Sequence, residues 1–196
     1  MAAAIQRALE RLYQLDRVAD VDEYVTFAAE DGEREALLVR EIGGEMELSL
    51  RLPALAKKEF DAGERDLDPL CQIIEGVSHF VYLADRARAC REATQLEMEL
   101  QAEVDKYVVL AASLGAVEPR SSALLRARLY DDVSYAHEPD TELGQRYRIA
   151  NYLAGKFVRG LERDYLAARR YRELHARLRA FYRMGQEEKL RVGRAA

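Results

Sequence analysis

Gly43 and Gly44 separate two runs of alternating polar and apolar residues, and no other feature constrains the fold of this chain as strongly. Two consecutive glycines adopt the positive φ angles of a tight hairpin turn without steric cost. With this pair as the loop, Arg40 lies opposite Glu47, and one face of the hairpin collects the apolar side chains. These are Leu37, Val39, Met46, Leu48, Leu50 and Leu52. A register shifted by one residue would bury charged residues instead, so the sequence predicts an antiparallel hairpin that ends before Pro53.

Two further segments extend this hairpin into an N-terminal substructure. Residues 2–15 place apolar side chains at helical spacing between charged ones, which predicts a short amphipathic helix. Residues 23–29 are rich in β-forming residues and precede an acidic, glycine-containing cluster, which predicts a third strand. The sequence therefore predicts a helix and a three-stranded antiparallel β-meander in residues 1–62. We expect residues 54–65 to form a short helix or an irregular connector.

Helix start and stop signals recur through residues 63–196. Asp68 and Pro69 open one predicted helix, and Thr94 with Glu97 forms a capping-box pattern for the next. Further starts are expected at 118–119 and 141, a break near Gly160 or Arg169, and a helix end at Gly185. The predicted fold class is thus α+β. An N-terminal helix and β-meander pack on a mostly antiparallel helical bundle, and the two parts form one compact unit.

The charge of the chain is divided unevenly along its length. Residues 146–196 hold 14 Lys and Arg against 5 Asp and Glu, while residues 1–145 hold 16 against 30. The C-terminal segment therefore carries a net charge of +9 and the rest −14. Such a split indicates either that the folded chain neutralises itself or that one end faces an anionic partner.

Arginines of the basic segment alternate with tyrosines, a mixture suited to recognition of anionic groups and aromatic surfaces. Arginine pairs with carboxylates through two parallel hydrogen bonds, and it also contacts phosphates and stacks on aromatic rings. The predicted binding residues are Arg148, Tyr152, Arg159, Arg163, Arg170, Tyr171 and Arg177. Three interpretations stay open: charge pairing within the chain or between subunits, binding of nucleic acid, and binding of other anionic ligands.

A second candidate site combines carboxylates with an imidazole. Glu75 and His79 are four residues apart on a predicted helix and so share one face, where they could form an acid–base pair or bind a metal. Glu99 and Glu103 repeat that spacing on the next predicted helix, which makes a metal site of all four residues a further candidate. The structural alternatives are an intrahelical hydrogen bond for the first pair and a solvated face for the second.

The sequence contains no recognisable catalytic or cofactor-binding motif. Gly-x-Ser-x-Gly, the phosphate-binding Walker loop, Gly-x-Gly-x-x-Gly and Cys-x-x-Cys are all absent, so no cofactor is predicted. The N-terminus lacks the unbroken apolar stretch of a signal peptide, which leads us to expect a cytoplasmic protein without membrane association.

Together these patterns predict a protein-binding or adaptor module that acts through its Arg- and Tyr-rich C-terminal helices. Apolar residues remain abundant to residue 182, which leads us to expect a homo-oligomer with some apolar surface reserved for a second copy. The alternatives are a nucleic-acid-binding protein that uses the same helices, and a helical-bundle enzyme or metal site around Glu75 and His79.

Overall fold

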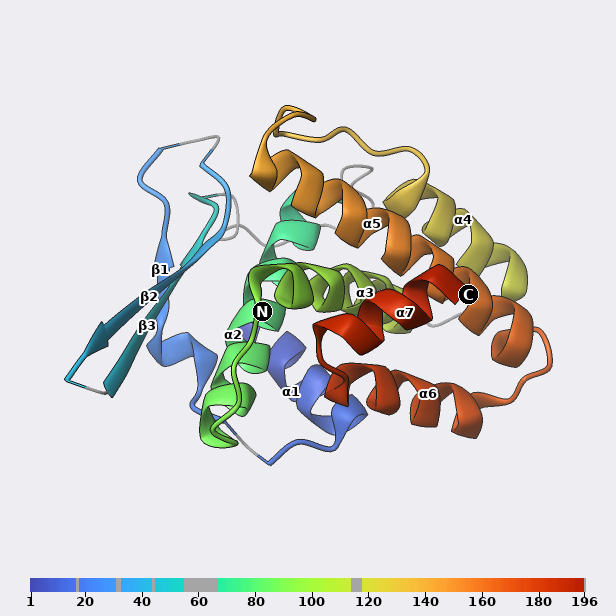
Figure 1. Ribbon diagram of the computed structural model, residues 1–196, viewed down its shortest axis with the longest axis horizontal. Helices are drawn as coiled ribbons and strands as arrows, with labels where there is room; N and C mark the ends of the chain where they lie inside the picture. The colour runs from blue at the N-terminus through green and yellow to red at the C-terminus, as the bar shows by residue number, and fades with distance from the viewer. Residues whose placement is uncertain (17, 31–32, 44, 55–66, 114–117, 196) are drawn as a thin grey trace. The chain divides into compact units, whose positions relative to one another are not determined.

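The computed structural model describes residues 1–16, 18–30, 33–43, 45–54, 67–113 and 118–195 (Figure 1). The chain divides into two compact units, one of residues 1–11 and 15–91 and the other of residues 12–14 and 92–196. The predicted boundary between residues 62 and 63 lies outside the described residues, as does the predicted connector beyond Ala54. Within the described residues, no helix has both the length and the apolar composition needed to cross a membrane.

The first unit combines helices with a three-stranded sheet. Its elements are α1 (Ala2–Tyr13, whose last two residues belong to the second unit), the 3-10 helix η1 (Val21–Glu23), β1 (Val25–Phe27), β2 (Ala36–Ile42), β3 (Glu45–Leu52) and α2 (Asp68–Arg88). The antiparallel register of β2 and β3 is confirmed: Arg40 lies opposite Glu47 and Val39 opposite Leu48. At the turn, Gly43 adopts a φ of +61°, the left-handed conformation that glycine permits.

The prediction of a three-stranded antiparallel meander, in contrast, is wrong. The strand order is β1-β3-β2, and β1 runs parallel to β3, with Val25 opposite Leu50. The physical reason lies just before β1, where the Tyr24 ring packs on Phe80 of α2 with 5.1 Å between ring centroids. Because α2 also packs on β3, this contact brings β1 to the β3 edge. Local sequence patterns favour a hairpin instead.

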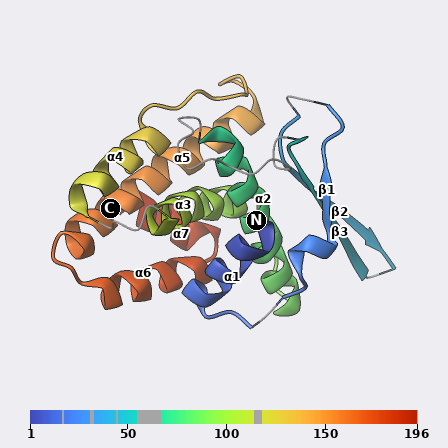
Figure 2. The same cartoon turned by 180° about the vertical axis from the view of Figure 1, so that it is seen from behind.

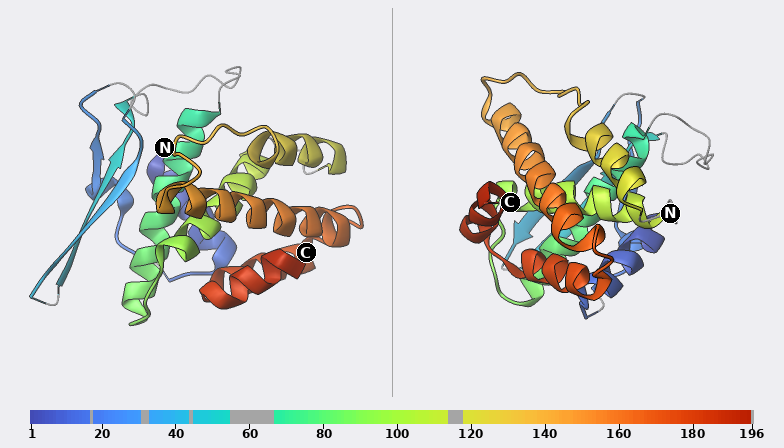
Figure 3. Two further views of the ribbon diagram at one scale, coloured as in Figure 1. Left: turned by 45° about the horizontal axis from the view of Figure 1, so that its top comes forward. Right: turned by 90° about the vertical axis from the view of Figure 1, so that its right-hand side faces the viewer.

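α2 lies close to the sheet because Gly76 has no side chain. A Cβ atom at this position would lie 2.9 Å from Leu50 Cδ1 and 3.3 Å from Leu52 Cδ2, so a larger residue would require these leucine side chains to shift. Leu50 and Leu52 are consequently buried. The far end of the hairpin points away from α2 (Figure 3, left). Along β2, Val39 and Ile42 are about half exposed.

The second unit is helical. It contains α3 (Gln95–Ser113), α4 (Pro119–Tyr130), α5 (Glu142–Leu161), the π-helix η3 (Glu162–Leu166), α6 (Tyr171–Arg183) and α7 (Gln186–Ala195). Two predicted caps are confirmed, because Thr94 Oγ1 accepts from Glu97 N at 3.1 Å and Thr141 Oγ1 accepts from Gly144 N at 3.0 Å. The predicted break near Arg169 is confirmed as well, since this residue adopts a φ of +55° between η3 and α6. Figure 2 shows the chain turning back there from the end of α5 into α6.

The core of the second unit mixes stacked aromatic rings with a buried polar network. Phe157 of α5 and Phe181 of α6 stack with 4.1 Å between ring centroids. Lys189 of α7 is fully buried and donates to Gln101 Oε1 at 2.7 Å, and Gln101 Nε2 donates to Asp105 at 2.9 Å. These hydrogen bonds satisfy buried polar groups that would otherwise destabilise the core, so they tie α7 to α3.

Candidate functional site

Some of the predicted binding residues make contacts within the second unit. Arg148 donates to the carbonyl oxygens of His137 and Gly144, both at 3.0 Å, and its guanidinium lies 4.4 Å from the centre of the Tyr135 ring. Arg170 forms an ion pair with Glu173 at 3.4 Å, in which both side chains are about half exposed. Charge pairing within the chain therefore accounts for part of the basic segment.

Three other predicted binding residues are exposed on the surface of the second unit. Tyr152 exposes 65% of its surface and Tyr171 exposes 42%. Arg159 is exposed on α5. Tyrosine is enriched at protein interfaces, because its ring buries a large apolar area when a partner covers it.

Arg163 and Arg177 both line a hollow on the surface of the second unit, which we call the basic hollow. It has a volume of about 320 Å³, and α5, η3, α6 and α7 contribute to its lining. The side chains important here are Phe157, Arg163, Asp164, Tyr165, Arg177 and Arg191. Among the lining residues, three guanidinium groups face one carboxylate, so the hollow carries a net positive charge. Sequence reasoning predicted two of these arginines but missed Arg191, because it did not predict the separate helix α7.

The single carboxylate of the basic hollow is held in its charged form. Arg163 donates to both oxygens of Asp164, at 2.6 and 2.8 Å, and these bonds lower the pKa of the Asp164 carboxyl below its ordinary value. Arg177 is placed differently, with its guanidinium 5.7 Å from the centre of the Phe157 ring. The hollow therefore offers both signs of charge in fixed places, together with aromatic rings.

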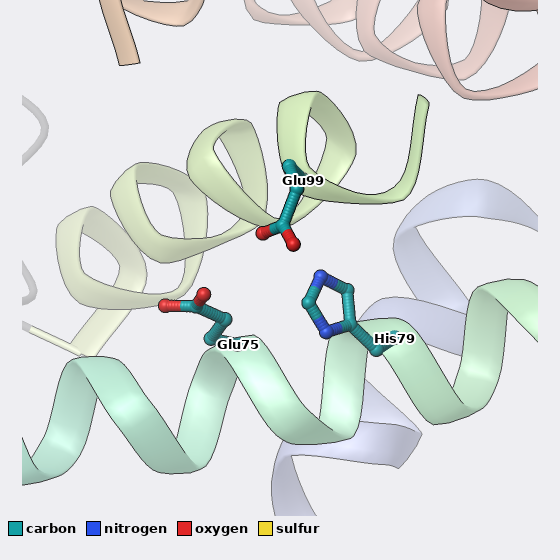
Figure 4. Close-up of side chains that lie close together, drawn as sticks. All are labelled: Glu75, His79 and Glu99. Atoms are coloured by element: carbon teal, nitrogen blue, oxygen red, sulfur yellow. The ribbon is translucent and has the colours of Figure 1, made fainter. Parts of the chain in front are cut away.

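Glu75 and His79 lie on one face of α2, as the spacing predicted (Figure 4). A carboxylate oxygen of Glu75 and a ring nitrogen of His79 lie within 4.8 Å of one another, Glu75 is buried and His79 is half-buried. Gln72 lies one turn before Glu75 on the same stripe, is 92% buried and donates to Asp68 at 2.6 Å. α2 therefore presents a buried polar stripe with a carboxylate and an imidazole in reach of one another.

A residue that sequence reasoning missed lies beside this stripe. Glu35 precedes β2, and its side chain is only 6% exposed. Burial, and next the charge of Glu75, raise the pKa of the Glu35 carboxyl to about 8. Within the described residues, Glu35 Oε2 accepts no hydrogen bond, and Arg34 Nε lies 4.0 Å from it. No local pattern could have indicated this pair, since Glu35 and Glu75 are forty residues apart.

Glu99 and Glu103 belong to α3 of the second unit. From the sequence, the structural alternative to a metal site was that both side chains lie on a solvent-exposed helix face. That alternative is wrong, because Glu99 and Glu103 expose only 8% and 6% of their surface. Within that unit, Glu99 lies 4.0 Å from Arg146 and Glu103 lies 2.7 Å from Lys106. These basic partners compensate the buried carboxylates. A metal site formed by all four predicted residues stays a prediction.

Comparison of this chain with protein-family models, with curated proteins and with solved structures finds no match.

Proposed function

We propose that this protein is a protein-binding or adaptor module whose C-terminal helices hold an acidic partner at the basic hollow. The observation that carries the proposal is the convergence of Arg163, Arg177 and Arg191 on one concave surface. Arg163 already pairs with Asp164, so Arg177 and Arg191 offer the guanidinium groups for bidentate pairs with a partner's carboxylates, and bonds of this kind are stronger than those between neutral groups.

The distribution of charges supports a protein partner over a nucleic acid. Asp164 stays ionised inside the hollow, and Glu173 forms an ion pair on the neighbouring surface of α6. Fixed carboxylates repel a continuous phosphate backbone, whereas an acidic protein surface can offer a lysine or an amide to each of them. The exposed rings of Tyr152 and Tyr171 add contact area of the kind found at protein interfaces.

Self-association of the module has a separate support in the first unit. In the described residues β2 pairs with β3 on one side only, so it is an edge strand of seven residues. Leu38, Val39 and Ile42 are about half exposed on this edge. In an antiparallel pairing of two β2 strands centred on Val39, no two like charges lie opposite one another. We therefore propose a dimer through β2, since an exposed apolar edge strand is a template for pairing.

The test of partner binding compares two probes of equal negative charge. Fluorescence anisotropy is measured for a labelled glutamate-rich peptide and for a labelled single-stranded RNA. A double variant, Arg163→Ala with Arg191→Ala, removes two charges from the basic hollow. Its matched control, Arg172→Ala with Arg183→Ala, removes two exposed charges elsewhere on α6.

We expect the peptide to bind and the hollow variant to weaken this binding about tenfold or more, while the control loses less than about threefold. Tighter binding of the RNA with steep salt dependence would favour the nucleic-acid alternative instead. Equal losses of peptide affinity in the two double variants would mean that the positive surface attracts anions generally and that the basic hollow is not a specific binding site.

A second candidate function is acid–base or metal chemistry on α2. The observation that favours it is the short distance between Glu75 and His79, together with the raised pKa of Glu35 beside them. Metal analysis of the purified protein tests the metal form, with His79→Ala as the variant and the exposed His175→Ala as the control. Stoichiometric Zn, Fe or Mn that only His79→Ala loses would support it, and substoichiometric metal in the unaltered protein would exclude it.

A further inference from the structure

The second unit contains a small apolar cavity that adjoins the basic hollow and shares Leu161 with it. Its volume is about 100 Å³, and most of its lining is carbon. Leu161, Leu166, Leu174 and Leu178 contribute from α5, η3 and α6, and Ala111 and Ala112 contribute from α3. Small-molecule sites are concave and mostly apolar, so a pocket of this kind between leucines and alanines is a candidate binding site.

One wall of the cavity is the π-helix η3. Its wide turns are closed by bonds from Ala167 N to Glu162 O at 2.9 Å and from Arg170 N to Tyr165 O at 2.8 Å. π-helical turns are rare and are frequently found at functional sites. This turn sets Glu162 and Leu166 toward the cavity, while Arg163 and Tyr165 line the basic hollow.

A chain of hydrogen bonds holds that wall in place. Glu162 accepts from Ser122 Oγ through one oxygen, and from Arg126 Nε through the other at 2.7 Å. Ser122 has a single hydroxyl hydrogen, which the carboxylate takes, so Tyr107 must donate to Ser122 Oγ across their 2.6 Å contact. Both oxygens of Glu162 are thus engaged, and its charge is balanced by Arg126.

The lining therefore selects an uncharged occupant. A charged ligand would exchange water for a mostly apolar lining, and this desolvation would be costly. The volume is about two-thirds of the roughly 150 Å³ of an apolar cavity that holds benzene, so a ligand of this size must use the open side of the pocket as well. The exposed side chain of His175 also lines the cavity, which places an entrance there.

We propose that this cavity is a binding site for a small uncharged molecule with one aromatic ring or a branched hydrocarbon of similar size. The site goes beyond the proposed partner binding and, apart from Leu161, uses other side chains. It is formed entirely within the second unit, and Glu162 with its partners Ser122 and Arg126 positions its wall.

Fluorine NMR with fluorobenzene as the probe tests the proposal. Saturable binding is expected below about 10 mM, with contacts from the ring to the methyl groups of Leu178 detected by nuclear Overhauser effects. Ala111→Leu fills the cavity and should weaken binding about tenfold or more. Ala180→Leu, at an exposed position of α6, is the control and should leave binding unchanged.

Two further measurements keep the test decisive if Ala111→Leu fails to fold. Benzoate and benzylammonium, which match the probe in ring size but carry a charge, should bind about tenfold more weakly or not at all to the unaltered protein. The Leu178 contacts must appear in the unaltered protein as well. Absence of saturable binding, contacts to other methyl groups only, or equal binding of the charged rings would each overturn the assignment.

Discussion

Replacing Glu162 by Gln should destabilise the second unit by removing the charge that its hydrogen-bond chain depends on. Arg126 and Glu162 expose only 15% and 13% of their side-chain surface, and Nε and Oε2 lie 2.7 Å apart. In the Glu162→Gln variant the amide has one acceptor oxygen for two donors, so either Ser122 or Arg126 loses its bond.

The size of this effect follows from the geometry. A hydrogen bond to a charged group contributes about 1.5–3 kcal/mol, and Arg126 retains an ion pair with Asp131 at 3.4 Å. We therefore expect a loss of about 2 kcal/mol, toward the lower end of that range. For a chain of this length, the midpoint of thermal unfolding should fall by about 6 °C.

Urea unfolding and hydrogen exchange together measure this change. Exchange should accelerate in η3 and in the facing part of α4, because the chain of bonds joins these two segments. Glu173→Gln is the matched control, since it breaks an ion pair in which both side chains are about half exposed, and such pairs contribute little to stability. The reasoning is refuted if the two variants are equally stable, or if exchange in η3 is unchanged.

Three further outcomes follow from particular contacts. The stability of the unaltered protein should fall as the pH rises from about 4.5 toward 8, because the unfolded chain releases the Glu35 proton first, and urea unfolding of Glu35→Gln should lack this part of the pH dependence. Gly144→Ala would place Cβ 1.8 Å from the Glu138 carbonyl oxygen, so chemical unfolding should show a loss of about 3 kcal/mol, and a neutral variant would contradict the contact. Val39→Lys should turn the proposed dimer into a monomer in sedimentation velocity; an unaltered protein that is already monomeric would reject the dimer.

The elements that could be predicted from the sequence are those whose causes are local. The turn at Gly43 and the alternation on both sides of it fix the hairpin register within about sixteen residues. The caps at Thr94 and Thr141 depend on residues three positions away, so they too could be predicted from short patterns.

The features that could not be predicted depend on contacts between distant residues. The direction of β1 is decided by the packing of Tyr24 on Phe80. The burial of the Glu99 carboxylate on α3 is compensated by Arg146, which is far along the chain. The π-helix η3 has no sequence signal, so the apolar cavity beside it could be found only from the folded chain. The third arginine of the basic hollow, Arg191, was missed because α7 was not predicted as a separate helix.

The most direct test of the proposed function is an NMR titration of the arginine Nε–H groups with the glutamate-rich peptide. The Nε–H signals of Arg163, Arg177 and Arg191 should shift together and saturate at one concentration, while those of Arg172 and Arg183 stay in place. Uniform small shifts of all five signals, or shifts confined to Arg172 and Arg183, would contradict binding at the basic hollow.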